Sequence, residues 1–364
     1  MPWPISTPSE IAARLRAGFD GALNGALARL WPNNVSVSAK VFGGGLSEVY
    51  DYQAWIKDQI FTRTCADEVL EDHGADLDLP IREATAATGL VVGTVSAAIA
   101  VSAGTIVTRG DGRSYSVVAD IGTSGPGDIA IQVMAVEPGA GGVALPGTVM
   151  TIAGVDGAVV DGAGLTGGAD RESYDSYRER LLFFKAYRPG HARPSDYVIW
   201  ASEVSGVSRV FVERRPYGPG TVRVFPLFDG IYEDGIPPAG EIARVQSYLD
   251  VVGASGVADI IVAAPVAQPI PVEIDELKPN LIGVRNVIRD EIRATVRRRG
   301  VVAGSDTPHP AMPFLATPQS FSRSWIGQAI SNAAGEDRHD LILPASNVTV
   351  SAGSIATYSD PGFS

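Results

Sequence analysis

Cysteine is almost absent from this sequence, and histidine is scarce. Cys65 is the only cysteine among 364 residues, which excludes an internal disulfide and any cysteine-based zinc cluster. The 4 histidines show neither the HxxxH nor the HExxH spacing that places two zinc ligands on one helix face. The sequence therefore predicts no metal site, and it fits a reducing compartment.

No segment of the chain has an excess of basic residues. Residues 1–83 carry 7 basic and 12 acidic side chains, 84–168 carry 2 and 6, 169–264 carry 11 and 13, and 265–364 carry 9 and 10, which gives the formal charge of −12. A surface that follows nucleic-acid phosphates needs clustered positive charge. We therefore expect protein partners and no nucleic acid.

Signals for export or membrane insertion are missing as well. The start, "MPWPISTPSEIAARL", has neither a basic region nor an apolar run of the kind that signal peptides contain. Residues 84–108 contain no charge, but they are rich in Gly, Ser and Thr, which is typical of strands and turns. We expect no secretory signal and no membrane span.

Motifs for catalysis or cofactor binding are also lacking. The glycines of "VFGGGLSEVY" are not followed by the Lys-Ser/Thr of a phosphate-binding loop, and no serine stands in G-x-S-x-G. Glu172 and Asp175 could act as the paired carboxylates of a cell-wall hydrolase. Asp175 instead stands four residues after Arg171 and three before Arg178, which favours ion pairs on an exposed helix. The sequence predicts no catalytic residue and no cofactor.

Length and composition indicate a multidomain α+β protein. A chain of 364 residues and 38.1 kDa exceeds one ordinary core. Shifts in composition divide it into a helical segment (1–83), a small Gly-rich β-domain (84–168), and two α+β sandwich-like domains (169–264 and 265–364).

The first segment predicts amphipathic helices. Thr7 to Glu10 has the capping-box pattern, and apolar residues then recur about every four positions from Ile11 to Leu30. A second helix is predicted from Ser47, and a short third one ends at Gly74. These helices are too few to enclose a thick core, so we expect them to bury their apolar faces against another subunit. The candidate interface residues are Ile11, Leu15, Leu23, Leu27, Trp55 and Ile60.

The second segment predicts about five or six short strands. It holds 18 of the 41 glycines, and Tyr115 is its only aromatic residue. Val/Ile/Thr runs alternate with turns such as "GDG" and "SGPGD". A β-rich adhesin is a possible function for such a domain, but the lack of aromatic residues does not favour carbohydrate binding.

The last two segments mix helices and strands. A helix is predicted from Asp170 to about residue 187, after the glycines Gly167 and Gly168, and a second one is capped by Ser195 or Asp196. The order helix, strand, strand, helix, strand then fills residues up to 264. A strand, a helix over 280–299 and a strand near the end suggest a looser second copy.

One helix predicted in the last segment carries a row of arginines beside an apolar stripe. The row can be a solvated face that Asp290 and Glu291 partly neutralise. It can also be a basic ridge that docks an acidic neighbour in an assembly, because charge complementarity orients interfaces. The ridge consists of Arg285, Arg289, Arg293 and Arg297.

Several spaced motifs resemble one known family. "LTGGADRESYDSYRERLL", with Gly167, Gly168, Asp170, Arg178 and Arg180, resembles the TGGxDxES…RxRLL signature of baseplate J-like proteins in the Mu-like branch, which are wedge components of contractile phage tails. "LPIREATAATGLVVGTV" before it, and "YRPGHARPSDYVIWASEVSGV" and "YGPGTV" after it, resemble further family elements in the expected order. The resemblance covers about residues 65–265.

The resemblance implies a structural subunit without a cofactor or a catalytic site. It implies assembly with a second wedge protein, around a central hub and spike, in several copies about a sixfold axis. It also implies a location in the virion, in the tail baseplate, after assembly in the host cytoplasm. The amino-terminal helices would bundle with helices of the partner.

Overall fold

The computed structural model describes residues 6–23, 33–187, 190, 192–253 and 258–364. It is a mixed α+β protein, as the sequence predicts, and its chain forms two compact units. The first unit comprises residues 1–81 with 173–183, and the second comprises 82–172 with 184–364. The expected division into four domains places residues 173–183 with the segment 169–264 instead, and it stays a prediction.

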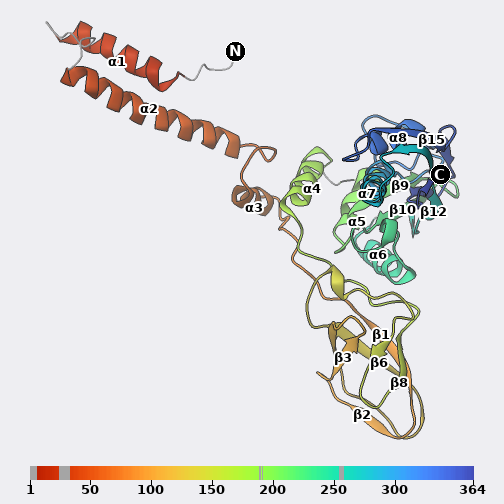
Figure 1. Cartoon of the computed structure of the whole chain (residues 1–364). Coiled ribbons are helices and arrows are strands. Elements are labelled where there is room, and N and C mark those ends of the chain that lie inside the picture. Colours follow the sequence, from red (N-terminus) through yellow and green to blue (C-terminus); the bar gives the residue numbers. More distant parts are fainter. Residues whose placement is uncertain (1–5, 24–32, 188–189, 191, 254–257) are drawn as a thin grey trace. The chain divides into compact units, whose positions relative to one another are not determined.

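Two helices lie side by side at the start of the first unit (Figure 1). Helix α1 (Pro8–Ala22) begins with the predicted capping box, in which Glu10 N donates to Thr7 Oγ1 at 3.3 Å and Thr7 N donates to Glu10 Oε2 at 2.8 Å. Helix α2 (Asn34–Gln59) is capped by Asn33 Oδ1, which accepts from Val35 N at 2.8 Å.

The predicted bounds of these two helices are wrong. Helix α1 ends at Ala22, and α2 begins at Asn34, 13 residues before the expected Ser47. Three consecutive glycines, 43–45, weaken the helical pattern in the sequence. Gly43 nevertheless allows the close approach of α1, because a Cβ atom on it would lie 3.1 Å from Ala12 Cβ.

Helices α3 (Asp67–Ala75) and α4 (Tyr174–Ala186) form the other part of the first unit. Helix α3 agrees with the prediction, whereas α4 begins four residues after Asp170. Ser173, not Asp170, provides N-cap geometry, with Ser176 N donating to its Oγ at 3.3 Å. Buried side chains of both helices form one small core with Cys65, namely Leu70, Tyr177 and Leu181.

The β-domain of the second unit is a six-stranded antiparallel sheet in the order β7-β3-β4-β6-β1-β8, with a separate β2-β5 pair. Short side chains fill its core, around Tyr115, whose hydroxyl donates to Gly142 O at 2.9 Å. The strands are β1 (Thr88–Val95), β2 (Ile99–Val101), β3 (Ile106–Arg109), β4 (Ser114–Val117), β5 (Ile121–Thr123), β6 (Gly127–Ala135), β7 (Met150–Thr151) and β8 (Asp156–Val160).

The predicted order helix, strand, strand, helix, strand is found after this domain. Strand β10 pairs antiparallel with β9 and parallel with β11. The elements are α5 (Pro194–Ser202), β9 (Arg209–Arg214), β10 (Thr221–Leu227), the 3-10 turn η2 (Glu233–Gly235), α6 (Ala239–Val252) and β11 (Asp259–Val262). Asp196 is the third residue of α5, and its carboxylate accepts from Arg193 N at 2.9 Å.

The last hundred residues contain more short elements than the sequence predicts. Helix α7 (Ile282–Arg299) packs with the unforeseen α8 (Arg323–Ser331) over a core that includes Ile288 and Ile292. Three small sheets have the orders β12-β17, β15-β13-β18 and β14-β16. Their strands are β12 (Val266–Pro269), β13 (Glu273–Lys278), β14 (Gln319–Phe321), β15 (Arg338–Leu343), β16 (Val348–Val350), β17 (Ser354–Thr357) and β18 (Gly362–Phe363).

Candidate assembly interface

Helix α2 has two faces of opposite character. Small residues, Ser36, Ala39 and Gly43, are buried on the face toward α1, where Ile11 and Ala12 are buried too. The rest of the helix surface exposes large apolar side chains along its length, and one of them, Leu46, borders the buried face because it stands seven residues after Ala39. They are Val37, Val41, Phe42, Leu46, Val49, Tyr52, Trp55 and Ile56, and Ile60 at the C-cap continues the row.

This exposed face, called here the α2 apolar face, follows a heptad spacing. Phe42, Val49 and Ile56 are seven residues apart, and Leu46 stands beside them one turn further on. Tyr52 and Trp55 stack with ring centroids 5.8 Å apart. Trp55 is 50% exposed and Ile60 62% exposed. Soluble monomers rarely expose contiguous apolar patches of this kind, and such patches mark interaction sites.

The N-terminal interface candidates divide into buried and exposed residues. Ile11 is only 3% exposed, because it packs on α2, and Leu15 is half-buried. Leu23 is 48% exposed. Leu27 lies outside the described residues. The sequence therefore located the apolar helices but did not distinguish the faces that pack within the chain from those that remain open, and it missed Phe42, Leu46 and Val49.

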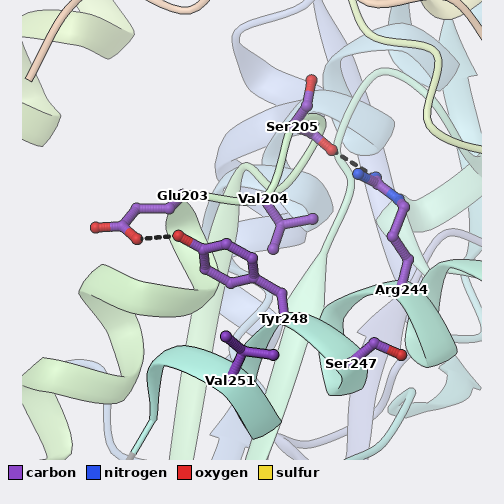
Figure 2. Close-up of a pocket in the computed structure, with 7 residues that line it drawn as sticks. All are labelled: Glu203, Val204, Ser205, Arg244, Ser247, Tyr248 and Val251. Carbon is purple, nitrogen blue, oxygen red and sulfur yellow. Dashed lines mark hydrogen bonds between the residues drawn. The ribbon is translucent and has the colours of Figure 1, made fainter.

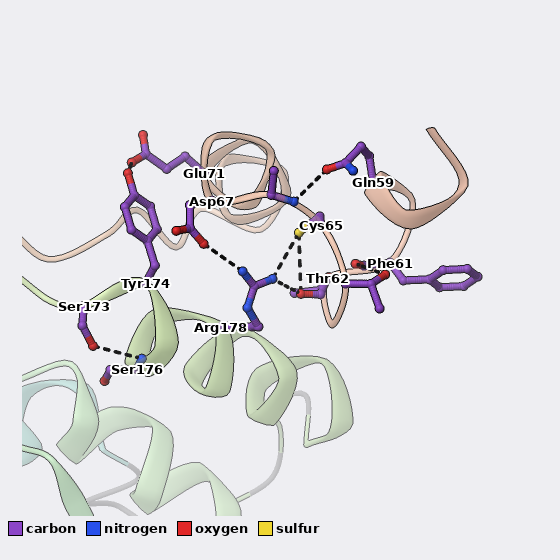
Figure 3. A network of polar contacts seen from close by, with 12 residues as sticks. Gln59, Phe61, Thr62, Cys65, Asp67, Glu71, Ser173, Tyr174, Ser176 and Arg178 are labelled. Carbon is purple, nitrogen blue, oxygen red and sulfur yellow. Dashed lines mark hydrogen bonds and ion pairs between the residues drawn. The ribbon is translucent and has the colours of Figure 1, made fainter. Parts of the chain in front are cut away.

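Arg178 connects α4 to the α3 region through a polar network (Figure 3). Its guanidinium donates to Thr62 O at 2.7 Å and to Cys65 Sγ at 3.4 Å, and it forms an ion pair with Asp67 at 2.9 Å. Tyr174 OH donates to Glu71 at 2.7 Å in the same network. The sequence predicts instead that Arg178 pairs along its own helix with Asp175. Its partners on other segments show that it is a packing residue.

Arg180 and Tyr177 hold the segment that follows α3. Arg180 donates to Pro80 O at 2.8 Å, and its guanidinium lies 5.1 Å from the centroid of the Tyr177 ring. Tyr177 is fully buried and donates from its hydroxyl to Leu79 O at 2.7 Å. The RxRLL part of the quoted motif therefore stabilises the fold of the first unit.

The TGGxD part of the motif forms a tight connection in the second unit. Gly167 has φ of +83°, which favours glycine. At Gly168 a Cβ atom would lie 2.8 Å from Gly139 O and 3.0 Å from Ala87 Cβ, so this glycine is required by close packing. Asp170 accepts from Ala140 N at 2.9 Å. The prediction that a helix begins at Asp170 is therefore wrong.

A buried carboxylate that the sequence analysis missed fixes this connection. Glu241 is 1% exposed and accepts from Gly167 N at 2.9 Å, from Tyr232 OH at 3.0 Å and from Arg244 Nε at 2.8 Å. Burial raises the pKa of Tyr232, and the charge of Glu241 raises it further. The position of Glu241 in the first turn of α6, three residues before an arginine, is the only sequence signal of this role.

A cavity of about 490 Å³ lies beside this network (Figure 2). Arg244 donates to Ser205 O at 2.6 Å at one end, and Tyr248 OH donates to Glu203 at the other. Burial, followed by the Glu203 hydrogen bond, raises the pKa of Tyr248 to about 12. Val204, Ser247 and Val251 complete the lining. Because the one carboxylate and the one phenol are bonded to each other, the cavity offers no free acid–base pair.

Of the two carboxylates considered for hydrolysis, Asp175 is exposed and Glu172 is half-buried. Glu172 accepts from Arg82 N at 3.2 Å and so joins two backbone segments. Among the described residues, no cluster of three or more His, Cys, Asp or Glu could hold a metal ion. Within that same part of the chain, none of the helices combines the length and the apolar content that a membrane span requires.

Three of the four ridge arginines on α7 contact the last residues of the chain. Arg285 and Arg289 lie 5.1 and 5.2 Å from the ring centroid of Phe363, and Arg293 lies 4.4 Å from that of Tyr358. Arg289 also forms an ion pair with Asp360 at 2.9 Å. Arg297 is exposed, and its charge acts on Asp229 and Asp234.

Comparison with known proteins finds one matching family model and similar baseplate proteins. The family model described as Baseplate J-like central domain matches residues 192–273. The baseplate protein gp47 of Escherichia phage Mu is 28% identical over 321 residues, which cover 85% of this chain and 89% of that protein. The Mu-like prophage FluMu protein gp47 of Haemophilus influenzae is 28% identical over 320 residues, 84% of each chain.

Among solved structures, the sixfold-symmetrised baseplate of the anti-feeding prophage contains a chain with a TM-score of 0.40 and 11% identity, covering 96% of this chain and 90% of that chain. The family match and the two relatives agree with the motifs read from the sequence. The protein contains a baseplate J-like central domain and is homologous to the Mu baseplate protein gp47 along most of its length.

Proposed function

We propose that this protein is a structural subunit of a phage tail baseplate wedge. It assembles with a second wedge protein, and with neighbouring copies of itself, around a central hub and spike, and it acts without a cofactor. It is assembled in the host cytoplasm and resides in the virion. The homology to baseplate proteins supports the baseplate role, and the α2 apolar face is the observation that supports assembly through a partner.

The α2 apolar face fits a helix of the second wedge protein. From Val37 to Ile60 the row covers 24 positions, or about 36 Å at 1.5 Å per residue. A seam repeated every seven residues is the pattern that packs against another helix in a left-handed supercoil. Gly45 lies within this seam with no atom within 4 Å of its Cβ position, which leaves a gap for a large side chain of the partner.

A pair of charged substitutions in the seam tests this proposal. Val49→Asp with Ile56→Asp should change the free energy of unfolding by less than about 1 kcal/mol, since both side chains are exposed in the isolated chain. Co-purification with the adjacent tail proteins should fall at least tenfold, because two carboxylates would be buried without partners.

Asp51→Lys is the matched control, because it reverses a charge at an exposed position of α2 on the side of the helix away from the row of Phe42, Val49 and Ile56. The control should co-purify as the wild type does. Stoichiometric co-purification of the doubly substituted chain would refute the assignment of this face to the partner helix.

A further inference from the structure

Residues 358–363, called here the C-terminal strap, lie against α7 and along the edge of β13. Strand β18 of the strap pairs parallel with β13, Glu273 opposite Gly362 and Ile274 opposite Phe363. Gly362 N donates to Val272 O at 3.0 Å, and Ser364 N donates to Ile274 O at 3.1 Å. The strap therefore occupies the outer edge of the three-stranded sheet β15-β13-β18.

The strap meets α7 through aromatic rings and one carboxylate. Phe363 contacts the guanidinium groups of Arg285 and Arg289, and Tyr358 contacts that of Arg293, as described above. Asp360 accepts from Arg289 Nε and from Tyr358 OH, both at 2.9 Å. Arginines spaced four residues apart on one helix therefore match an aromatic–acid–aromatic sequence in an extended segment.

These attachments are partly open to solvent. Asp360 is 68% exposed in its side chain, whereas Tyr358 and Phe363 are half-buried and pack at the edge of the core under α7. Pro361 is the buried residue of the strap. Ion pairs and cation–π contacts at exposed sites are weak and are screened by salt. A two-residue parallel strand adds few hydrogen bonds, so the strap is held mainly by contacts that another segment of the same chemistry can also make.

The surface under the strap has the features of a peptide-binding site. An unpaired edge of β13 would offer backbone donors and acceptors to an added strand. The arginine row beside it would bind aromatic rings and donate hydrogen bonds to a carboxylate. The structure already shows which chemistry this surface binds, because the strap is its occupant.

We propose that the surface formed by the β13 edge and by Arg285, Arg289 and Arg293 is a binding site for an extended segment of a neighbouring protein that carries an acid between two aromatic residues. The strap occupies this site within the chain until such a segment displaces it. Only the origin of the segment, a baseplate neighbour, rests on the proposed function. Binding of a peptide to the purified chain can be tested without any baseplate protein.

The test uses the full chain and a fluorescein-labelled peptide of residues 357–364, Thr-Tyr-Ser-Asp-Pro-Gly-Phe-Ser. In one variant, Tyr358→Ala with Phe363→Ala loosens the strap. We expect saturable binding of the peptide to this variant, and binding at least tenfold weaker to the wild-type chain, because the wild-type strap competes at a high effective concentration. Adding Arg289→Glu to the loosened variant should reduce binding at least tenfold.

Absence of saturable binding to the loosened variant would overturn the proposal, as would equal binding to the wild type or binding that Arg289→Glu leaves unchanged. Hydrogen exchange of the wild-type chain gives an independent measurement. The amides of Gly362 and Ser364 should exchange at least tenfold faster than those in the middle of α7. Equal protection of strap and helix would mean that the strap is a fixed part of the fold and would also overturn the proposal.

Discussion

At the scale of single residues, a buried carboxylate has more influence on this fold than any of the acids that the sequence brought to attention. Glu241 is 1% exposed, so water cannot replace its partners, whereas Glu172 and Asp175 lie near the surface. Breaking one member of a buried hydrogen-bonded charge pair leaves the other without compensation. Position in a helix and residue type did not reveal this, because burial depends on the segments that pack around α6.

Glu241→Gln should destabilise the second unit by about 2 kcal/mol or more, since the amide cannot serve Gly167 N, Tyr232 OH and Arg244 together as the carboxylate does. The free energy of unfolding from denaturant titration is the measurement. Glu233→Gln, at an exposed position of η2, is the control and should change it by less than about 0.5 kcal/mol. Equal effects of the two substitutions would contradict the role of Glu241.

The two glycines of the TGG motif should respond to valine for different reasons. Gly167→Val places a β-branched residue at φ of +83°, which costs about 1–2 kcal/mol in backbone strain. Gly168→Val adds side-chain atoms where Gly139 O lies 2.8 Å from the Cβ position, so overpacking costs about 1–3 kcal/mol.

The positive φ is at Gly167 and not at Gly168. Alanine in place of valine separates the two causes. Gly168→Ala should retain much of the overpacking cost, because the clash begins at Cβ. A melting temperature of Gly168→Ala equal to that of the wild type would show that the backbone there moves freely.

At the scale of elements, periodic apolar residues predicted most helices but not their ends or their open faces. Helices α3 and α7 agree closely with the prediction, since their glycines, Gly74 and Gly283, stand near the helix ends and leave the apolar repeat intact. Helix α2 was predicted to begin 13 residues too late, because the glycines at 43–45, of which Gly43 lets α1 approach, weaken helical propensity. The short strands and α8 after residue 300 could not be predicted, because their pairing joins segments far apart in the sequence.

The strap should detach in alkaline solution. Burial, followed by the hydrogen bond to Asp360, raises the pKa of Tyr358 to about 12. The positive charges of Arg289 and Arg293 act in the opposite direction. The backbone of Tyr358 also forms a hydrogen bond with Asp234. The neutral phenol is therefore favoured in the folded chain. Its contribution to the stability of the attached strap is complete below about pH 10 and is lost as the pH rises through about 12.

Difference ultraviolet absorbance between the wild type and Tyr358→Phe reports the titration of this one phenol. We expect a midpoint near pH 12 in the wild type. Asp360→Asn should lower the midpoint, because the hydrogen bond and the negative charge that oppose ionisation of the phenol are weakened. A midpoint near the ordinary tyrosine pKa in the wild type would show that the strap contacts are absent in solution.

At the scale of the whole molecule, the compact units cross the boundaries that composition suggests. The expected break before Ala84 separates helices from strands, yet α4 belongs with the first unit through residues 173–183. Composition changes along the chain could not show that a segment about a hundred residues later returns to pack on α3. This packing depends on side chains such as Tyr177 and Leu181. Their apolar spacing predicts a buried helix face but not the segment against which that face packs.

This arrangement determines which N-terminal deletion tests the assembly role. Deletion of residues 1–57 removes the α2 apolar face but keeps Cys65, Leu70 and the network around Arg178. The remainder should fold cooperatively and stay soluble, because the α3–α4 core and the second unit keep their partners. It should not co-purify with the second wedge protein.

The chain that lacks residues 1–83 should instead aggregate or melt at a lower temperature, because this deletion exposes Tyr177 and Leu181, which are fully buried in the intact chain. Thermal melting and co-purification of both shortened chains test these expectations. Stoichiometric binding by the chain that lacks residues 1–57 would show that the partner binds outside the α2 apolar face. Equal stability of the two shortened chains would show that α4 does not need the α3 region.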